Sequence, residues 1–184
     1  MKNLKIVFTL IFFVFAVQSF SQTGDVTKEP GYVDFGDLTA FEKSTGVTEV
    51  ILEEDLLSVL ASISDEKDPN IMSILSGLKL VRATVFEVSD ENKGELERRV
   101  NDIDSRLSNS DWKRIVRTRS ESEIANVYIK LENNKKIVGL VVTSFESGNE
   151  AAFVNIVGKI DLATIGKLGK KFNIPTLDNV ESEK

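Results

Sequence analysis

The side chains that could do chemistry in this chain are few, because the sequence contains neither histidine nor cysteine. Ser-His-Asp and Cys-His catalysis each need one of these residues. Zinc, copper and haem sites also take them as their usual ligands. What remains are oxygen-ligand metal sites, carboxylate pairs and Ser-Lys devices. An enzyme that uses carboxylates or a bound metal is therefore the less favoured class, and no catalytic residue is predicted.

Two acid-rich stretches could bind calcium through oxygen ligands, residues 53–55 (EED) and 64–70 (SDEKDPN). Neither has the twelve-residue loop with regularly spaced acids that typical calcium sites use. The first stretch suits the start of a helix, where the helix dipole favours negative charge. The second suits a solvated loop. No metal site and no cofactor is predicted.

Basic side chains gather on a predicted strand over residues 112–118. Alternation places four side chains on one face: Lys113, Ile115, Arg117 and Arg119. Arg82 could join them if the predicted strand 78–88 pairs alongside. Such a patch could bind an anionic ligand or an acidic partner segment. A solvated strand face, balanced by nearby acids, is the favoured alternative because surface charges usually contribute little.

A G-x-x-G sequence with an internal lysine, Gly166 to Gly169, resembles nucleic-acid clamps. These glycines lie within an apolar helical stripe, so close packing of a helix on a sheet explains them better. The net charge of the chain is −6, and removing residues 1–21, with two lysines and no acids, would take it to −8. An acidic protein repels phosphates. A nucleic-acid partner is therefore excluded.

Residues 1–21 have the three-part pattern of a secretory signal peptide. They combine a positive start, an apolar run and small residues before the cleavage point: Lys2 and Lys5, residues 6–17, and Ser19 and Ser21 ahead of Gln22. An uncleaved anchor is the alternative, but the apolar run is shorter than the roughly 20 residues that a spanning helix needs. The lack of cysteine removes the lipoprotein route. The sequence predicts export to the periplasm, the cell surface or the medium, with no stable membrane insertion after cleavage.

The exported part is predicted to be one α+β domain over residues 31–175, preceded by a flexible linker (22–30) and followed by a disordered acidic tail (176–184). Hydrophobic periodicity predicts six strands and three helices. The strands are 47–51, 78–88, 112–118, 124–131, 136–145 and 151–160, and the helices are 52–63, 94–107 and one that follows Asp161. Their order is β-α-β-α-β-β-β-β-α. We expect a two-layer sandwich, with the helices on one face of a largely antiparallel sheet.

The predicted strand 136–145 is apolar on both faces, whereas an antiparallel sheet with one wet face alternates. Something must therefore cover its second face. The favoured candidate is the segment 31–41, which is rich in apolar residues. A homodimer, a partner protein or a small apolar ligand are the alternatives.

Three segments carry a resemblance to a known family: PGYVDFGDL (30–38), WKRIVRTR (112–119) and AAFVNIVGKIDLATIGKLGKKFNIP (151–175). They resemble the bacterial domain of unknown function family 4252, over about residues 31–175. The resemblance implies a small exported protein, mostly from Gram-negative bacteria, and no catalytic residues.

The favoured hypothesis is a non-enzymatic binding module of the cell envelope, with an unknown protein partner or a second copy as its ligand. A structural or adhesive component of the envelope is the alternative.

Overall fold

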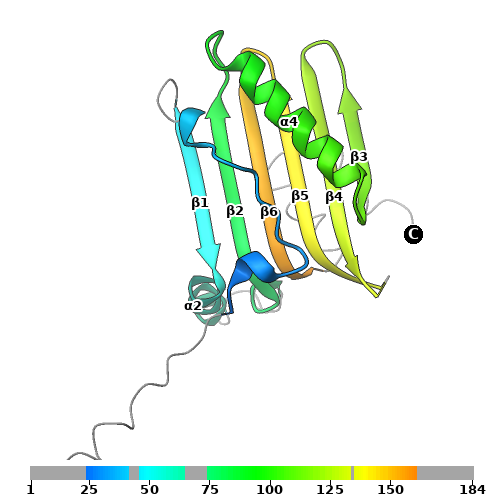
Figure 1. Ribbon diagram of the computed structural model, residues 1–184. Helices are drawn as coiled ribbons and strands as arrows, with labels where there is room; N and C mark the ends of the chain where they lie inside the picture. Colours follow the sequence, from blue (N-terminus) through cyan, green and yellow to red (C-terminus); the bar gives the residue numbers. More distant parts are fainter. Residues whose placement is uncertain (1–23, 42–45, 65–73, 134, 161–184) are drawn as a thin grey trace, which may run out of the picture.

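Figure 1 shows the computed structural model of the chain, which describes residues 24–41, 46–64, 74–133 and 135–160. Its elements are the 3₁₀ helices η1 (Val26–Lys28) and η2 (Thr39–Phe41), then β1 (Val47–Glu53), α2 (Glu54–Ser64), β2 (Leu78–Glu87), α4 (Lys93–Ser108), β3 (Trp112–Arg119), β4 (Glu123–Glu132), β5 (Lys136–Glu146) and β6 (Glu150–Ile160). The α+β class is confirmed, and the α-helices and strands match the first eight predicted elements. The predicted helix after Asp161 lies outside the described residues.

The strands form one antiparallel sheet in the order β1-β2-β6-β5-β4-β3. Strands β3 to β6 follow each other as a meander, and β6 then pairs with β2, so the two halves of the chain join in the middle of the sheet. Asn133 and Gly148 adopt positive φ values of 50° and 76° in the two turns that flank β5. Asparagine and glycine tolerate this conformation, which explains their place in these turns.

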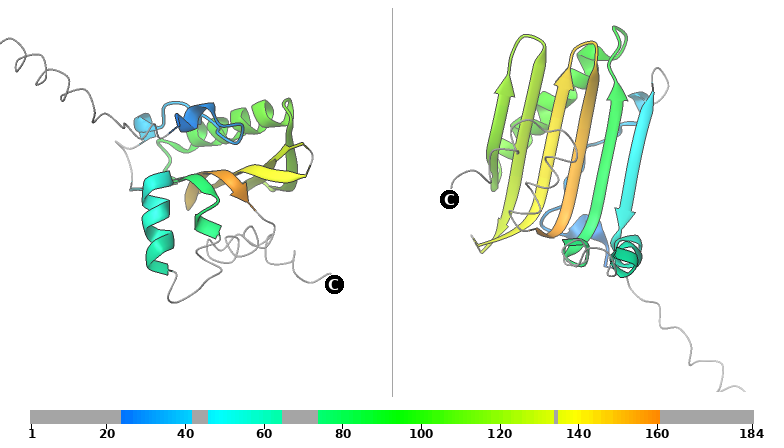
Figure 2. Two further views of the ribbon diagram at one scale, coloured as in Figure 1. Left: turned by 90° about the horizontal axis from the view of Figure 1, so that it is seen from below. Right: turned by 180° about the vertical axis from the view of Figure 1, so that it is seen from behind.

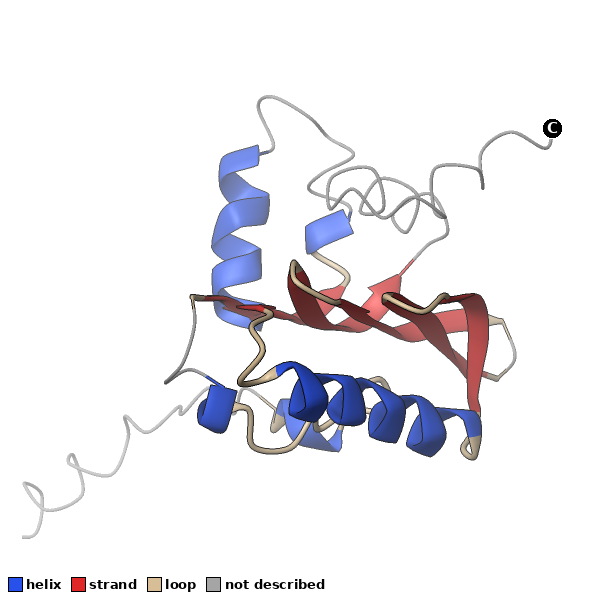
Figure 3. Ribbon diagram, turned by 90° about the horizontal axis from the view of Figure 1, so that it is seen from above, coloured by secondary structure: helices blue, strands red, loops and turns tan. Residues whose placement is uncertain are grey.

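Helix α4 and the N-terminal segment lie together on one face of the sheet, which we call the first face (Figures 2 and 3). This arrangement corrects the expectation that residues 31–41, here called the strap, cover the face opposite the helices. Phe35 of the strap packs on Phe153, with ring centroids 5.8 Å apart, and Phe41 packs on Phe86 at 5.5 Å. Phe153 and Phe86 lie on the face of the sheet that also buries the apolar residues of α4.

The opposite face of the sheet, the second face, has its own apolar cluster. Its buried members are Leu57, Leu78, Val127, Ile129, Ile137, Leu140, Val142, Ile156 and Ile160. Leu57 belongs to α2, and Figures 2 and 3 show α2 projecting from the sheet on the side opposite α4. The prediction that all helices share one face is therefore wrong, because an apolar surface on both sides of the central strands needs cover on both sides.

A buried asparagine and two glycines hold the strap on the first face. The Asn155 side chain accepts a hydrogen bond from Val33 N at 2.9 Å and donates to the carbonyl oxygens of Gly31 at 3.0 Å and Leu140 at 3.2 Å. A Cβ atom added to Gly139 would lie 2.5 Å from Gly31 Cα. The strap therefore crosses β5 with its backbone directly on the backbone of the strand, at a point where neither chain carries a side chain.

Arginines of α4 fix the outer edge of the strap. Arg99 donates to the carbonyl oxygens of Phe35 at 2.6 Å and Asp37 at 3.1 Å, and Arg106 donates to that of Asp34 at 2.8 Å. No described strand pairs with the strap, so the guanidinium groups supply the hydrogen bonds that its backbone needs.

Thr143 is a weak point of the same layer. Its side chain is 0% exposed, and its hydroxyl has no hydrogen-bond partner among the described residues. The side chain of Asn126, directly across on β4, is likewise buried and without such a partner. Burying a polar group without a partner costs about 1–3 kcal/mol.

Replacing Thr143 by valine, which has nearly the same shape, should therefore raise the free energy of unfolding by about 1 kcal/mol. Urea unfolding followed by circular dichroism would measure this gain. Thr118→Val, a change on the edge strand β3, is a suitable control. A loss of stability in Thr143→Val would show that the hydroxyl is satisfied.

Candidate functional site

The predicted basic patch is not assembled in the structure. Arg82 lies on β2 and the other three residues lie on β3, at the far edge, with β6, β5 and β4 in between. The guanidinium group of Arg82 forms an ion pair with Glu49 of β1, with the nitrogen and oxygen 3.4 Å apart. Arg82 is thus an internal partner of the β1–β2 pair.

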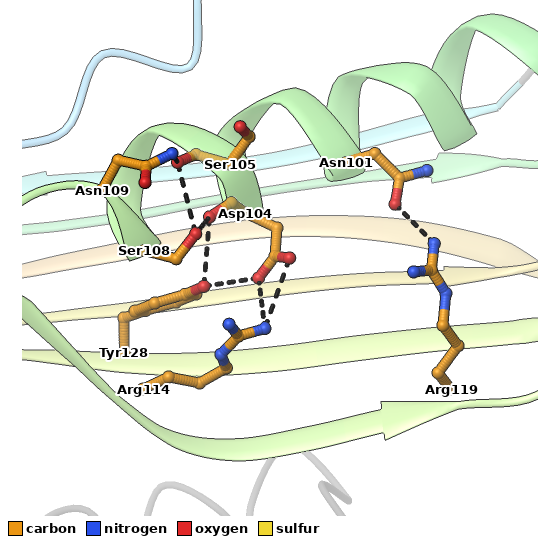
Figure 4. Close-up of polar contacts among 8 residues, drawn as sticks. All are labelled: Asn101, Asp104, Ser105, Ser108, Asn109, Arg114, Arg119 and Tyr128. Atoms are coloured by element: carbon orange, nitrogen blue, oxygen red, sulfur yellow. Dashed lines mark hydrogen bonds and ion pairs between the residues drawn. The ribbon is translucent and has the colours of Figure 1, made fainter.

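A β-bulge also divides the residues on β3. Lys113 lies opposite Ile129, which belongs to the second face, whereas Arg117 and Arg119 lie opposite Asn126 and Ile124. The pairing register shifts between Arg114 and Val116, and this extra residue reverses the alternation. Arg119 turns toward α4 and donates to Asn101 Oδ1 at 2.8 Å (Figure 4). The predicted patch depends on regular alternation along β3, which this bulge interrupts, and nothing in the residue types marks the bulge.

A compact cluster of polar side chains around Asp104 joins α4 to the sheet (Figure 4). Arg114 donates to both carboxylate oxygens of Asp104, at 3.0 and 3.3 Å, and the Tyr128 hydroxyl donates to the same carboxylate. Burial, reinforced by the hydrogen bond to Asp104, raises the pKa of Tyr128 to about 12. The phenol therefore stays protonated at neutral pH, and Arg114 binds the carboxylate. This cluster suits a structural contact that holds α4 on the sheet, not an acid–base pair.

A groove of about 520 Å³ runs along the outer side of α4 where it meets the strap. Its charged lining is balanced: Arg98, Arg99 and Arg106 face Asp34, Glu95 and Asp102. Arg99 and Arg106 are the side chains that bind the strap carbonyls. A groove whose cations are engaged and matched by acids offers no selective site for an anion.

In the described part of the chain, the other candidate sites from the sequence do not form a metal site or another functional cluster. Residues 53–55 span the end of β1 and the start of α2, as expected from the helix dipole. Among the described residues, no group of three or more acidic side chains is placed to hold a metal ion. No helix in the described ranges is long and apolar enough to cross a membrane. Residues 65–70, the glycines Gly166 and Gly169, and the cleavage pair Ser21 and Gln22 lie outside the described residues.

The most distinctive surface of the described chain is instead an apolar stripe on α2. Its members follow the spacing i, i+3, i+4, i+7 and are 39–68% exposed: Leu56, Val59, Leu60 and Ile63. Among the described side chains of this helix, only Leu57 and Ala61 are buried. The apolar residues of this helix share a helical spacing that is visible in the sequence, but the structure shows that most of them do not face the sheet.

Acidic residues border the stripe. Glu54 and Asp55 occupy the first turn of α2, which contains no lysine or arginine, and Glu53 precedes them. The clue available in the sequence was the width of the apolar face, since Leu56, Leu57, Val59 and Leu60 cover more of the helix than one flat sheet can contact.

The edge strand β1 also exposes apolar side chains. Val47, Val50 and Ile51 are exposed by more than 40%, and no described strand pairs with the outer edge of β1. Long apolar edges are normally shielded because they invite pairing with another chain.

Comparisons with known proteins give a family but no further relative. No curated protein and no solved structure matches the chain. One family model covers most of the chain, from the end of η2 through all six strands and beyond β6. The match leaves out residues 31–40, so most of the strap lies outside it, although the resemblance seen in the sequence included that segment. The chain belongs to the domain of unknown function family DUF4252, whose model matches residues 41–168.

Proposed function

We propose that this protein is an exported, non-enzymatic interaction module of the cell envelope that binds a protein partner through the α2 stripe. The observation that carries the proposal is the row of exposed apolar side chains at helical spacing on a projecting helix. Monomeric soluble proteins seldom expose such rows without a partner. The signal-like residues 1–21 support export, and the lack of histidine and cysteine supports a role in binding.

The charges around the stripe indicate the partner's chemistry. An apolar helix face with acids at its start fits an apolar groove that is bordered by lysine or arginine. An anionic membrane would instead be repelled by Glu53, Glu54 and Asp55. We therefore propose a protein with a basic-rimmed groove as the partner.

Replacing Val59 and Ile63 by serine should weaken this binding about 100-fold or more, because each side chain contributes about 1.5–3 kcal/mol when it is fully buried. The measurement is capture from an envelope extract by the immobilised mature protein, followed by titration of the captured partner. Both side chains are more than half exposed, so the double variant should fold normally.

The matched control is Ser58→Ala with Ser62→Ala, two changes on the other side of the same helix. This variant should bind like the wild type. Equal binding by the stripe variant would contradict the proposal, as would preferential binding of the wild type to lipid vesicles.

Intact-mass measurement of the exported protein should give a chain that starts at Gln22. A chain that keeps residues 1–21 would contradict export by cleavage.

A further inference from the structure

We propose that two copies of this protein pair through β1, antiparallel, about a two-fold axis that passes beside Val50. The proposal goes beyond the α2 stripe and rests on the outer edge of the sheet, which no described strand pairs with. That edge is seven residues long, Val47–Glu53, and ends the strand order of the sheet. It carries no lysine, proline or described bulge, three of the features that protect an edge, and its only charged residues are Glu49 and Glu53.

The direction of the backbone groups makes this edge ready to pair. Gly46 accepts a hydrogen bond from Glu87 N of the neighbouring strand, at 3.0 Å. Backbone groups alternate along a strand, so those of residues 48, 50 and 52 point to β2 as well. The N–H and C=O groups of Val47, Glu49, Ile51 and Glu53 therefore point outward, where a second strand can bind them.

The charges select one register. A two-fold axis normal to the sheet pairs residues of the same face, so it must be centred on a residue. An axis centred on Glu49 sets the two Glu49 residues opposite each other, and an axis centred on Ile51 sets Glu49 opposite Glu53. Both registers place like charges directly across the seam. Centring on Val50 avoids both contacts and is the register that pairs all seven residues.

In this register each acid meets an apolar residue. Glu49 lies opposite Ile51 of the second copy, and Glu53 lies opposite Val47. The two Glu49 side chains become diagonal neighbours at about 7–8 Å. Each is already in an ion pair with its own Arg82, at 3.4 Å, which offsets their repulsion. On the second face the row reads Thr48, Val50 and Leu52 against the same three residues.

Pairing also fixes where the two α2 helices stand. The axis is normal to the sheet, so both helices project from the second face of one twelve-stranded sheet, at opposite ends of the paired strands. If the proposed function holds, the dimer presents two apolar stripes on one side and binds its partner at two points, which increases avidity.

The decisive experiment uses single cysteines, since the chain has none of its own. In Val50→Cys the two introduced side chains lie opposite each other in a non-hydrogen-bonded pair, the closer type, within reach of a disulfide. In Ile51→Cys they are diagonal and out of reach. The two positions are matched in exposure, at 42% and 44%. Under mild oxidation, the first variant should form a covalent dimer at least tenfold faster.

Light scattering of the purified mature protein, at tens of micromolar, should give twice the chain mass. Val50→Lys sets two positive charges opposite each other and should give the monomer mass with an unchanged circular dichroism spectrum.

A monomeric wild type, or equal cross-linking of the two cysteine variants, would overturn the proposal. If the wild type is a monomer and Val50→Lys no longer captures the partner that the wild type captures, then the edge binds a different protein and this inference is wrong. Stripe-dependent capture that persists in a monomer would leave the proposed function intact while this inference fails.

Discussion

Replacing Asn155 by leucine should lower the free energy of unfolding by about 3–5 kcal/mol and release the strap from the sheet. The side chain is 1% exposed, and its amide makes three hydrogen bonds to the backbone, two of them to the strap. Each net bond contributes about 1 kcal/mol, and the groups left without a partner cost more because they stay buried. Urea unfolding would measure the loss.

Trp112 makes the release of the strap directly visible. It is the only tryptophan of the chain, and it packs against the first-face cluster that contains Phe35 and Phe41. In Asn155→Leu its fluorescence should shift to longer wavelength before the main unfolding transition. Thr143→Val is the matched comparison, since it also replaces a buried polar side chain of the same face by an apolar one. The two changes should have opposite signs, because the amide of Asn155 is fully bonded and the hydroxyl of Thr143 is not. An unaffected Asn155→Leu would show that apolar contacts alone hold the strap.

Local periodicity predicted the elements of this fold well. Every predicted strand and helix inside the described residues is present, with its ends within two residues of the prediction. The α4 stripe illustrates the reason, since Leu96, Val100, Ile103 and Leu107 recur at helical spacing and all four are buried. The spacing of apolar residues is a property of neighbouring positions, so the sequence shows it directly.

Long-range relations could not be predicted in the same way. The position of β6 between β2 and β5 separates Arg82 from the basic residues of β3, and no local pattern encodes that order. The bulge near Val116 then separates Lys113 from Arg117. Asn155 is the residue in the sequence that points to the strap, because it is a polar residue within the apolar run 151–158 of β6. A buried amide of this kind needs partners, and here the strap supplies them.

The exposed α2 stripe shows the limit for the candidate site. The helical spacing of Leu56, Leu60 and Ile63 is plain in the sequence, but spacing alone cannot tell whether a stripe faces the core or a partner. The orientation of α2 decides this, and it follows from how the helix leaves the edge strand. A sequence can therefore predict an apolar face without predicting that it is exposed.

The second large effect should come from adding one methyl group to β5. In Gly139→Ala the new Cβ would lie 2.5 Å from Gly31 Cα and 2.7 Å from the ring of Trp112, both closer than real contacts allow. The same crossing is closed from the other side, since a Cβ on Gly31 would overlap the carbonyl group of Val138. Backbone lies on both sides, so neither chain can move away without breaking its hydrogen bonds to Asn155.

Overpacking of this kind costs about 1–3 kcal/mol or more, and we expect the upper part of that range for Gly139→Ala. Gly94→Ala is the matched control, because Gly94 lies in α4 with open space around its Cα. That change should leave stability equal or raise it by up to about 1 kcal/mol, as alanine favours helices. Thermal unfolding of both variants tests the crossing. Equal midpoints would show that the strap does not cross β5 in contact with Gly139. A selective loss in Gly139→Ala, with the tryptophan shift of Asn155→Leu, would show that the glycine pair and the asparagine hold the same segment.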